Sequence, residues 1–275
     1  QVIQRDRLVA ALLEEVESNY ADSVTVEHGV AVNSCTFSES GDKATLEIFE
    51  CKEDGDYCDT KAKETIETSL VIGAEGNAGK RGSAVIRAMD ESKMCKTKMV
   101  KLKERIESTR VYKIIPIELP DGFRTDLNYS SRTGKGVAME CLPTKEGLLV
   151  GVLLVKPTDE ETCLKLSDPK KLREYLDSDF PMFSKMVSDE NVEKVAKSKF
   201  SGLPNFQYAG GALHLSSCAG LIGDAIHTVK PYFGMGVNSA FEDVTVLEEC
   251  IENAKGDSKI FLPLYSKKRA ADAKA

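Results

Sequence analysis

The stretch Gly223–Asp243 reads GDAIHTVKPYFGMGVNSAFED, and it follows a short apolar run, LHLSSCAGLI, at residues 213–222. The run is typical of a buried strand that ends at Gly223-Asp224, and a helix is expected to begin at about Asn238. In α/β proteins, ligands bind at the carboxyl ends of parallel strands. The stretch therefore predicts a carboxylate, that of Asp224, at the ligand-binding edge of a parallel sheet.

The residue types in this stretch suit a flat, partly anionic ligand. The Asp224 carboxylate is able to accept hydrogen bonds from ribose or ribitol hydroxyls. Pro231, Gly234 and Gly236 let the backbone lie close against a planar ring. The helix opened by Asn238 would turn its first N–H groups and the positive end of its dipole towards negative charge on that ring. A glycine-rich turn that merely closes the fold is the alternative for the glycines taken alone.

Further apolar runs outline the rest of the first and last parts of the chain. Residues 5–18 place apolar side chains on one helical stripe, and residues 69–73, SLVIG, resemble a buried parallel strand. Charged residues 52–67 predict an exposed loop. Other short strands, including an antiparallel ribbon, are expected at residues 24–26, 30–32 and 44–49.

The middle of the chain has a different pattern. Residues 110–157 contain three apolar runs separated by turn residues, which predicts an antiparallel sheet. Residues 159–200 are charged and helical, with Pro169 near one helix start and a break at Phe180-Pro181. This order predicts an α/β fold in which a partial Rossmann-like domain is interrupted by an antiparallel β-sheet domain.

Composition restricts the class of protein. The chain has 275 residues and a net charge of −7, so a nucleic-acid partner has no electrostatic support. It contains no run of 18 apolar residues and no signal peptide is expected. The eight cysteines form no C-x-x-C pair, which favours reduced thiols in an intracellular protein, cytoplasmic or organellar; a Cys51–Cys58 disulfide is the alternative. The three histidines have no metal-ligand spacing, so no metal is expected.

The stretch as a whole resembles the second FAD-binding motif of class A flavoprotein monooxygenases, most closely kynurenine 3-monooxygenase-like proteins with the p-hydroxybenzoate hydroxylase fold. The resemblance rests on Gly223-Asp224-Ala225, His227, Pro231, Gly234, Gly236, Asn238 and Phe241-Glu242-Asp243. It implies FAD as cofactor, NAD(P)H as co-substrate, and hydroxylation of a small aromatic substrate with O2. The flavin would supply the oxygen chemistry, and the protein would position and shield it.

Three other stretches resemble the same family. An R-x-x-L-x-x-x-L helix begins at Arg5, which the resemblance places near the FAD phosphates. Residues 70–76, LVIGAEG, match a strand motif associated with FAD and NAD(P)H contact, with Glu75 in place of the usual Asp. Tyr112-Lys113 resembles a strand at the edge of the substrate sheet.

The resemblance assigns roles residue by residue. Asp224 would bind the ribityl or pyrophosphate region, and backbone groups of residues 234–238 would meet the isoalloxazine. No catalytic side chain is assigned. The cofactor-binding candidates are Arg5, Glu75, Gly223, Asp224, Pro231, Gly234, Met235, Gly236, Val237 and Asn238. The substrate-binding candidates are Lys230, Tyr232 and Phe233, and a solvent-facing position is the alternative for Lys230.

The resemblance also divides the chain into domains. Residues 1–88 would form part of the FAD-binding domain without its first βαβ unit, and residues 89–205 an inserted β-sheet substrate domain with helices. Residues 206–275 would complete the FAD-binding domain and begin the C-terminal helices.

Several features depart from the family and leave alternatives open. The chain has no GxGxxG, so the resemblance places its start inside the FAD-binding domain. Met235, Val237 and Lys230 replace other residue types, which leaves the substrate open. The alternatives are a truncated, inactive relative that serves as a scaffold or subunit, and a non-hydroxylating flavoprotein such as an epoxidase or oxidase. The choice between NADH and NADPH, the oligomeric state, membrane contact and a mitochondrial location are likewise open.

Overall fold

The computed structural model describes residues 5–51, 62–76, 83–92, 98–101, 109–124, 126–134, 136–144, 148–203, 206–229 and 235–272. They belong to two compact units. One unit takes its described residues from 1–25 and 104–203, and the other from 26–103 and 204–275. The second unit is therefore discontinuous in sequence, and residues 104–203 are inserted into it. The assignment of the units to cofactor and substrate stays a prediction.

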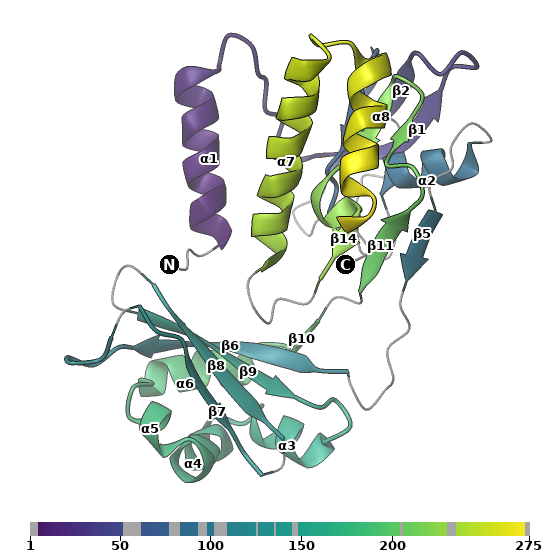
Figure 1. Ribbon diagram of the computed structural model, residues 1–275. Coiled ribbons are helices and arrows are strands. Elements are labelled where there is room, and N and C mark those ends of the chain that lie inside the picture. The colour runs from purple at the N-terminus through teal and green to yellow at the C-terminus, as the bar shows by residue number, and fades with distance from the viewer. Residues whose placement is uncertain are drawn as a thin grey trace. The chain divides into compact units, whose positions relative to one another are not determined.

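The discontinuous unit combines small sheets with helices, as the ribbon in Figure 1 shows. Its described strands form three sheets, in the orders β1-β2-β3, β14-β11-β5 and β12-β13-β4. Its strands are β1 (Val30–Phe37), β2 (Ala44–Glu50), β3 (Glu64–Thr68), β4 (Val71–Gly73), β5 (Lys98–Lys101), β11 (Gln207–Gly210), β12 (His214–Leu215), β13 (Ala219–Leu221) and β14 (His227–Thr228). Its helices are α2 (Ala84–Glu91), the 3-10 turn η2 (Gly223–Ala225), α7 (Met235–Asn253) and α8 (Ser258–Arg269).

A parallel strand pair lies in this unit, as the two apolar runs predicted. Strand β4 pairs with β13 from Val71↔Ala219 to Gly73↔Leu221. All three residues of β13 are buried, but the run at 213–222 forms two strands, because β12 folds back antiparallel on β13. Gly73 permits the close packing, since a β-carbon there would lie 2.7 Å from Leu221 Cδ2.

The ribbon predicted near the start of the chain is present and longer than expected. Strands β1 and β2 pair antiparallel, and β3 adds to them through contacts such as Leu46↔Ile66. The loop predicted at 52–67 was therefore wrong at residues 64–67, which belong to β3. The side chains of ETIET alternate between the two faces of the sheet, as in any strand, and this short alternation was overlooked. The strand predicted at 24–26 was also wrong. Val24 and Val26 are 44% and 40% exposed and belong to no strand.

The inserted unit contains the predicted antiparallel sheet, with strand order β10-β6-β9-β8-β7. Helices lie against one face of it in Figure 1, and the two layers enclose a core of aliphatic and aromatic side chains. Its strands are β6 (Val111–Glu118), β7 (Tyr129–Arg132), β8 (Ala138–Pro143), β9 (Leu148–Val155) and β10 (Ser201–Gly202). Its helices are α1 (Arg5–Asn19), α3 (Glu160–Lys165), α4 (Pro169–Asp179), α5 (Pro181–Ser184) and α6 (Asp189–Lys197).

Tyr112-Lys113 does not lie at the edge of this sheet as expected. The two-residue strand β10 pairs with β6 at Val111 and Tyr112, and β9 covers the other side of β6. Lys113 is almost fully buried, and its Nζ donates to the carbonyls of Leu166, Val195 and Ala196 at 2.9–3.0 Å. Since helix C-termini leave carbonyls without partners, this ammonium joins β6 to the ends of α3 and α6.

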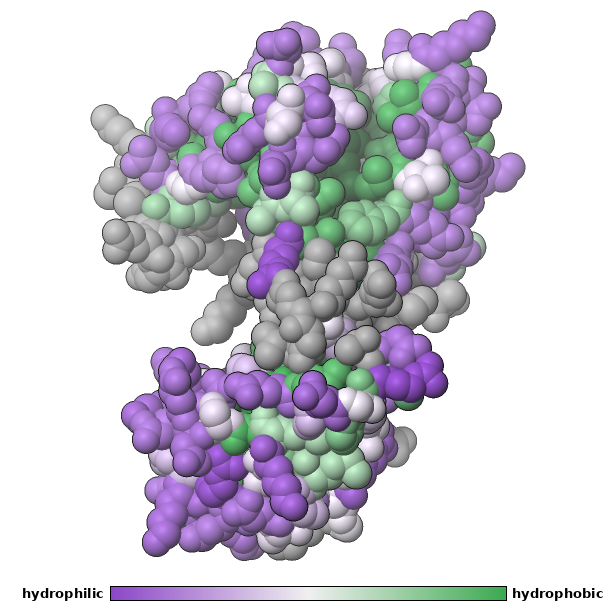
Figure 2. Space-filling view, turned by 90° about the vertical axis from the view of Figure 1, so that its left-hand side faces the viewer, coloured by the Kyte–Doolittle hydropathy of each residue, from purple (hydrophilic) through white to green (hydrophobic). Residues whose placement is uncertain are grey.

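Helix α7 buries a different face from the one its apolar residues suggest. The predicted helix is confirmed, but Phe241, Val244 and Ile251 of the apolar stripe are exposed. Asp243 and Cys250 are buried instead. Figure 2 likewise shows hydrophobic residues that reach the surface among hydrophilic ones. No helix within the described residues is long and apolar enough to cross a membrane.

Candidate functional site

The parallel strand pair places two segments at one edge of its sheet. Strands β4 and β13 end side by side at Gly73 and Leu221, and the Ile222 amide donates to the Gly73 carbonyl at 3.1 Å. The chain leaves β4 towards Glu75 and leaves β13 into Gly223-Asp224. Both carboxylates therefore follow the carboxyl ends of parallel strands, which is the ligand-binding edge in α/β folds.

The turn after β13 brings Asp224 to the first turn of α7. Gly223 has a φ of +63°, a left-handed conformation that favours glycine, and it starts η2. The Thr228 hydroxyl donates to the Asp224 carbonyl at 2.9 Å and holds the turn. A β-carbon on Gly236 would lie 3.8 Å from Asp224 Oδ1 and 3.6 Å from Val229 Cγ2. The carboxylate thus lies beside the beginning of a 19-residue helix.

Asp224 combines partial burial with a carboxylate that has no hydrogen-bond donor among the described residues. Burial raises its pKa above the ordinary value, and the nearby His227 opposes that rise. The first N–H groups of an α-helix also have no partner inside the helix. The edge of the sheet thus offers hydrogen-bond acceptors and donors side by side.

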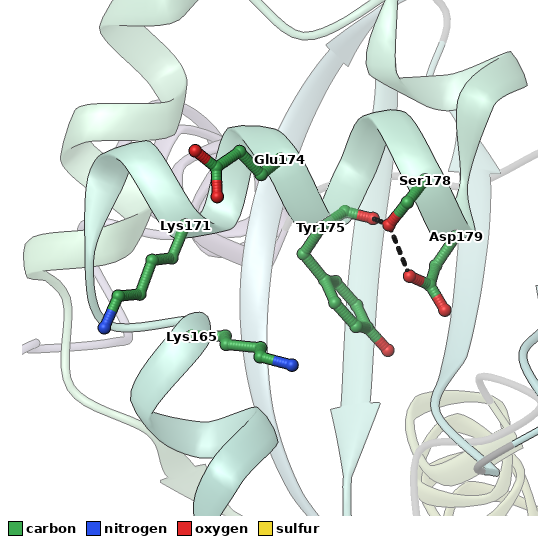
Figure 3. A pocket seen from close by; sticks show the side chains of 6 residues that line it. All are labelled: Lys165, Lys171, Glu174, Tyr175, Ser178 and Asp179. Atoms are coloured by element: carbon green, nitrogen blue, oxygen red, sulfur yellow. Dashed lines mark hydrogen bonds between the residues drawn. The ribbon is translucent and has the colours of Figure 1, made fainter.

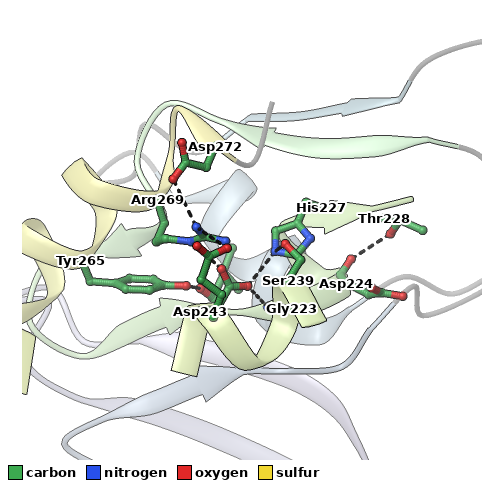
Figure 4. Close-up of polar contacts among 11 residues, drawn as sticks. Gly223, Asp224, His227, Thr228, Ser239, Asp243, Tyr265, Arg269 and Asp272 are labelled. Atoms are coloured by element: carbon green, nitrogen blue, oxygen red, sulfur yellow. Dashed lines mark hydrogen bonds and ion pairs between the residues drawn. The ribbon is translucent and has the colours of Figure 1, made fainter. Parts of the chain in front are cut away.

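Next to the turn that contains Asp224, Asp243 is the centre of a buried polar network, drawn in Figure 4. Its side chain is fully buried and lies on the inner face of α7. Its Oδ2 accepts from the Gly223 amide at 2.8 Å and contacts His227 Nε2 at 2.7 Å. Its Oδ1 accepts from Arg269 Nε of α8 at 2.7 Å. In the same region, the Tyr265 hydroxyl donates to the Leu221 carbonyl at 3.1 Å.

The network shifts the titration of its members in opposite directions. Burial disfavours the Asp243 carboxylate, but hydrogen bonds from His227, Gly223 and Arg269 outweigh that effect and lower its pKa. Burial also disfavours charge on His227, and the hydrogen bond and negative charge of Asp243 outweigh it and raise its pKa. His227 Nδ1 is buried and has no hydrogen-bond partner among the described residues.

Glu75 shares the sheet edge with Asp224 but is directed to another helix. Its carboxylate accepts from the Ser83 hydroxyl and from the amides of Ala84 at 2.9 Å and Val85 at 3.3 Å. These contacts cap the N-terminus of α2, where a negative charge is favourable. Burial raises the pKa of Glu75, and the helix amides and Arg87 oppose the rise.

The predicted site residues that the structure brings together are Gly223, Asp224 and the first turn of α7, which contains Met235, Gly236, Val237 and Asn238. The helix begins at Met235, so Asn238 lies within the first turn and does not open the helix. Val237 and Asn238 are exposed. Arg5 is the first residue of α1, in the other unit, and its side chain is not described.

Five predicted site residues lie outside the described part of the chain: Lys230, Pro231, Tyr232, Phe233 and Gly234. Their assignments to flavin and substrate stay predictions, as do those of the other site residues.

Sequence reasoning missed the role of Arg269 altogether. Arg269 belongs to the basic run that ends α8, and such a run is typical of a solvated helix end. The structure shows its guanidinium buried against Asp243. The signal that would have indicated the pair is Asp243, an acidic residue on the buried face of the preceding helix α7. The apolar residues Phe241, Val244 and Ile251 lie on another face of α7, so their spacing did not indicate that Asp243 is buried.

A separate hollow of about 390 Å³ lies on α3 and α4 of the inserted unit, as Figure 3 shows. Two lysines and two acidic residues balance each other in its lining, and Ser178 donates to Asp179 at 2.6 Å. The lining residues are Lys165, Lys171, Glu174, Tyr175, Ser178 and Asp179. This mixture of positive and negative charge is typical of a solvated surface and selects no ligand class.

The cysteines and acidic residues add no second centre in the described residues. The described cysteines are Cys35, Cys51, Cys141, Cys163, Cys218 and Cys250, and each is a free thiol. Cys58, the other half of the disulfide alternative, lies outside the described residues. No group of three or more His, Cys, Asp or Glu side chains in the described ranges is arranged to hold a metal ion.

Comparison with known proteins points to flavoenzymes. No protein-family model matches the chain. Among curated proteins it is similar to kynurenine 3-monooxygenase 2 of Aspergillus niger, with 28% identity over 178 residues, which cover 59% of this chain and 36% of that protein. The match therefore spans about a third of the relative's length.

Solved structures show the same fold over almost the whole chain. PqsL of Pseudomonas aeruginosa, described as a probable FAD-dependent monooxygenase, superposes with a TM-score of 0.62 at 20% identity, covering 97% of this chain and 65% of PqsL. HpxO of Klebsiella pneumoniae, solved with FAD and uric acid, has a TM-score of 0.58 at 18% identity, covering 97% of this chain and 59% of HpxO. The chain thus has the α/β fold of the FAD-dependent monooxygenases, and it resembles the class A flavoprotein monooxygenases, among them kynurenine 3-monooxygenases.

Proposed function

We propose that this chain forms the core of an FAD- and NAD(P)H-dependent monooxygenase that hydroxylates a small aromatic substrate. The observation that supports this most is the position of Asp224. Its partly buried carboxylate, which has no donor among the described residues, follows a parallel strand and lies beside Gly236 in the first turn of α7. The similarity to kynurenine 3-monooxygenases and to FAD-dependent monooxygenases of known structure supports the same cofactor.

The donors and acceptors of the site fit the two ends of a flavin. The Asp224 carboxylate would accept hydrogen bonds from ribityl or ribose hydroxyls, which would offset the cost of its burial. The first-turn amides of α7 would donate to the electron-rich edge of the isoalloxazine, where the helix dipole favours negative charge. Gly236 leaves the backbone bare at this point, so a flat ring is able to approach it closely.

The residues behind the site keep it in place. Asp243 holds the Gly223 amide and His227, so the turn that carries Asp224 is fixed on both sides. When bound, the flavin supplies the redox and oxygen chemistry, and the protein binds, orients and shields it. The substrate is proposed only as a small aromatic compound, with Lys230, Tyr232 and Phe233 as the side chains that would meet it.

The visible absorption spectrum of the full-length protein, purified and then supplied with FAD, tests the proposal. Bound-flavin bands that disappear on denaturation are expected, together with NADPH or NADH oxidation stimulated by small aromatic acids. Asp224→Ala should weaken FAD binding, and the exposed control Thr245→Ala on α7 should not. A folded protein that takes up no FAD would favour the inactive scaffold, and FAD binding without substrate hydroxylation would favour a flavoprotein of another activity.

A further inference from the structure

We infer that Arg269, at the end of α8, is a positioning residue for the flavin site and that it acts through Asp243. The inference rests on the proposed function, because it concerns the turn that would hold the cofactor. Arg269 itself contacts neither Asp224 nor Gly236 in any described interaction. It acts on them through the two oxygens of one buried carboxylate.

The two oxygens of Asp243 have separate partners. Oδ2 holds the site, since it receives the Gly223 amide and His227 Nε2. Oδ1 holds Arg269 Nε. A carboxylate accepts strong hydrogen bonds on both oxygens only while it is ionised. The strength of the Oδ2 contacts with Gly223 and His227 therefore depends on the negative charge of Asp243, which the ion pair between Oδ1 and Arg269 stabilises.

Arg269 is the permanent positive charge of this network. Its side chain is 4% exposed, while that of Asp243 is 0% exposed. The other carboxylates that pair with Arg269 are those of Glu242 and Asp272, and these are 62% and 61% exposed. Water screens exposed pairs, so the contact with Asp243 dominates what Arg269 contributes.

The remaining titratable groups around Asp243 do not replace Arg269. His227 is in contact, but its charge depends on pH. Tyr265 of α8 is buried beside the network and its pKa is raised by burial, so it stays neutral and donates to Leu221. Asp224, near His227, is of like charge to Asp243. Without Arg269, a buried carboxylate would be paired with one titratable histidine, and a proton on Asp243 would become favourable near neutral pH.

Protonation of Asp243 would loosen the site without unfolding it. A neutral carboxyl is a weaker acceptor for the Gly223 amide, and His227 would lose the charge that fixes its orientation. Gly223 and His227 flank Asp224 in the sequence, so Asp224 would lose its fixed position beside Gly236. We therefore expect a pH-dependent cofactor affinity in variants that lack the Arg269 charge, where the natural protein shows little dependence from this source.

The experiment compares Arg269→Met, Arg269→Lys and the double control Glu242→Gln/Asp272→Asn in the full-length protein. FAD titrations from about pH 6 to about pH 8 give the dissociation constants, and hydrogen exchange of residues 223–229 is measured without FAD. Arg269→Met should weaken FAD about tenfold at about pH 6, where Asp243 of the variant takes up a proton while that of the natural protein stays ionised, and less at about pH 8, with faster exchange at the lower pH. Arg269→Lys should restore most of both, since it restores the charge at Oδ1. The control should match the natural protein.

The outcomes separate this inference from the proposed function. Equal loss of affinity in Arg269→Met and Arg269→Lys, independent of pH, would overturn it, because that is the signature of packing alone. Unchanged exchange at residues 223–229 in Arg269→Met would also overturn it. Failure of the natural protein to take up FAD would refute the proposed function, whereas the exchange measurement would still decide whether Arg269 orders the turn.

Discussion

Replacement of Gly236 by alanine should stabilise the protein and weaken its cofactor binding at the same time. Gly236 lies in the first turn of α7 and its φ is not in the left-handed region. A β-carbon there would meet Val229 at 3.6 Å and Asp224 Oδ1 at 3.8 Å, which are ordinary van der Waals distances. The described residues around this position therefore give no steric reason for a glycine.

The expected gain in stability follows from helix propensity and chain entropy. Alanine in place of a helical glycine with compatible backbone angles raises the free energy of unfolding by about 0.4–1 kcal/mol, and a position in the first turn favours the lower half of that range. In a domain of this size, the gain corresponds to a rise in the melting temperature of about 1–3 °C. The same methyl group would occupy the place where a flat ring approaches the backbone, so FAD affinity should fall at least about tenfold.

Thermal unfolding and FAD titration of the two proteins test both halves of the prediction. Thr245→Ala, an exposed substitution later in α7, is the matched control, since it raises helix propensity far from the first turn. It should increase stability and leave FAD affinity unchanged. A Gly236→Ala protein that is stabilised and binds FAD with full affinity would show that the cofactor does not approach this turn, and it would refute the reasoning.

Three further predictions concern buried charges. Lys113→Met should lower the free energy of unfolding by about 3 kcal/mol, measured by denaturant titration, because three carbonyls each lose one hydrogen bond from the buried ammonium; Lys194→Met, with an exposed ammonium, should change little. Asp224→Asn should stabilise the FAD-free protein above about pH 4, since the fold raises the pKa of that carboxyl and so disfavours its ionised form, and the gain should vanish at lower pH. Stability that comes from the raised pKa of His227 should be complete below the ordinary histidine value of about 6.5, and it should be lost as the pH rises above that value and through the raised pKa of the folded state; His227→Gln should remove this alkaline slope, and an unchanged slope would contradict the assignment.

Local patterns in the sequence predicted the elements that depend on local physics. The short apolar runs at 69–73 and 213–222 formed the parallel pair β4 and β13, and β13 is buried throughout. Pro169 begins α4 because proline at a first helical position loses no hydrogen bond. The motif at 223–243 predicted that a carboxylate and a helix start would meet, and Asp224 lies beside Gly236.

Contacts between distant residues were not predictable in the same way. The buried face of α7 is set by Asp243, whose partner Arg269 lies 26 residues further along the chain. The apolar residues Phe241, Val244 and Ile251, which repeat at helical spacing, are exposed and therefore do not mark the buried side of the helix. Glu75 shows the same limit. Its motif indicated cofactor contact, which stays a prediction, and gave no sign that its oxygens also cap α2 at Ser83 and Ala84.

Residues 223–243 thus contain two carboxylates in opposite situations. Asp224 is left without a described donor while Asp243, only 19 residues later, has three partners at 2.7–2.8 Å. A turn that holds a partly buried carboxylate is costly, because burial disfavours the charge. The Asp243 carboxylate contacts the Gly223 amide before Asp224 and the His227 ring after it, so it holds the turn on both sides. If Asp224 binds the cofactor as proposed, its position would therefore depend on a buried charge pair, and Arg269, which completes that pair, belongs to a helix outside the motif.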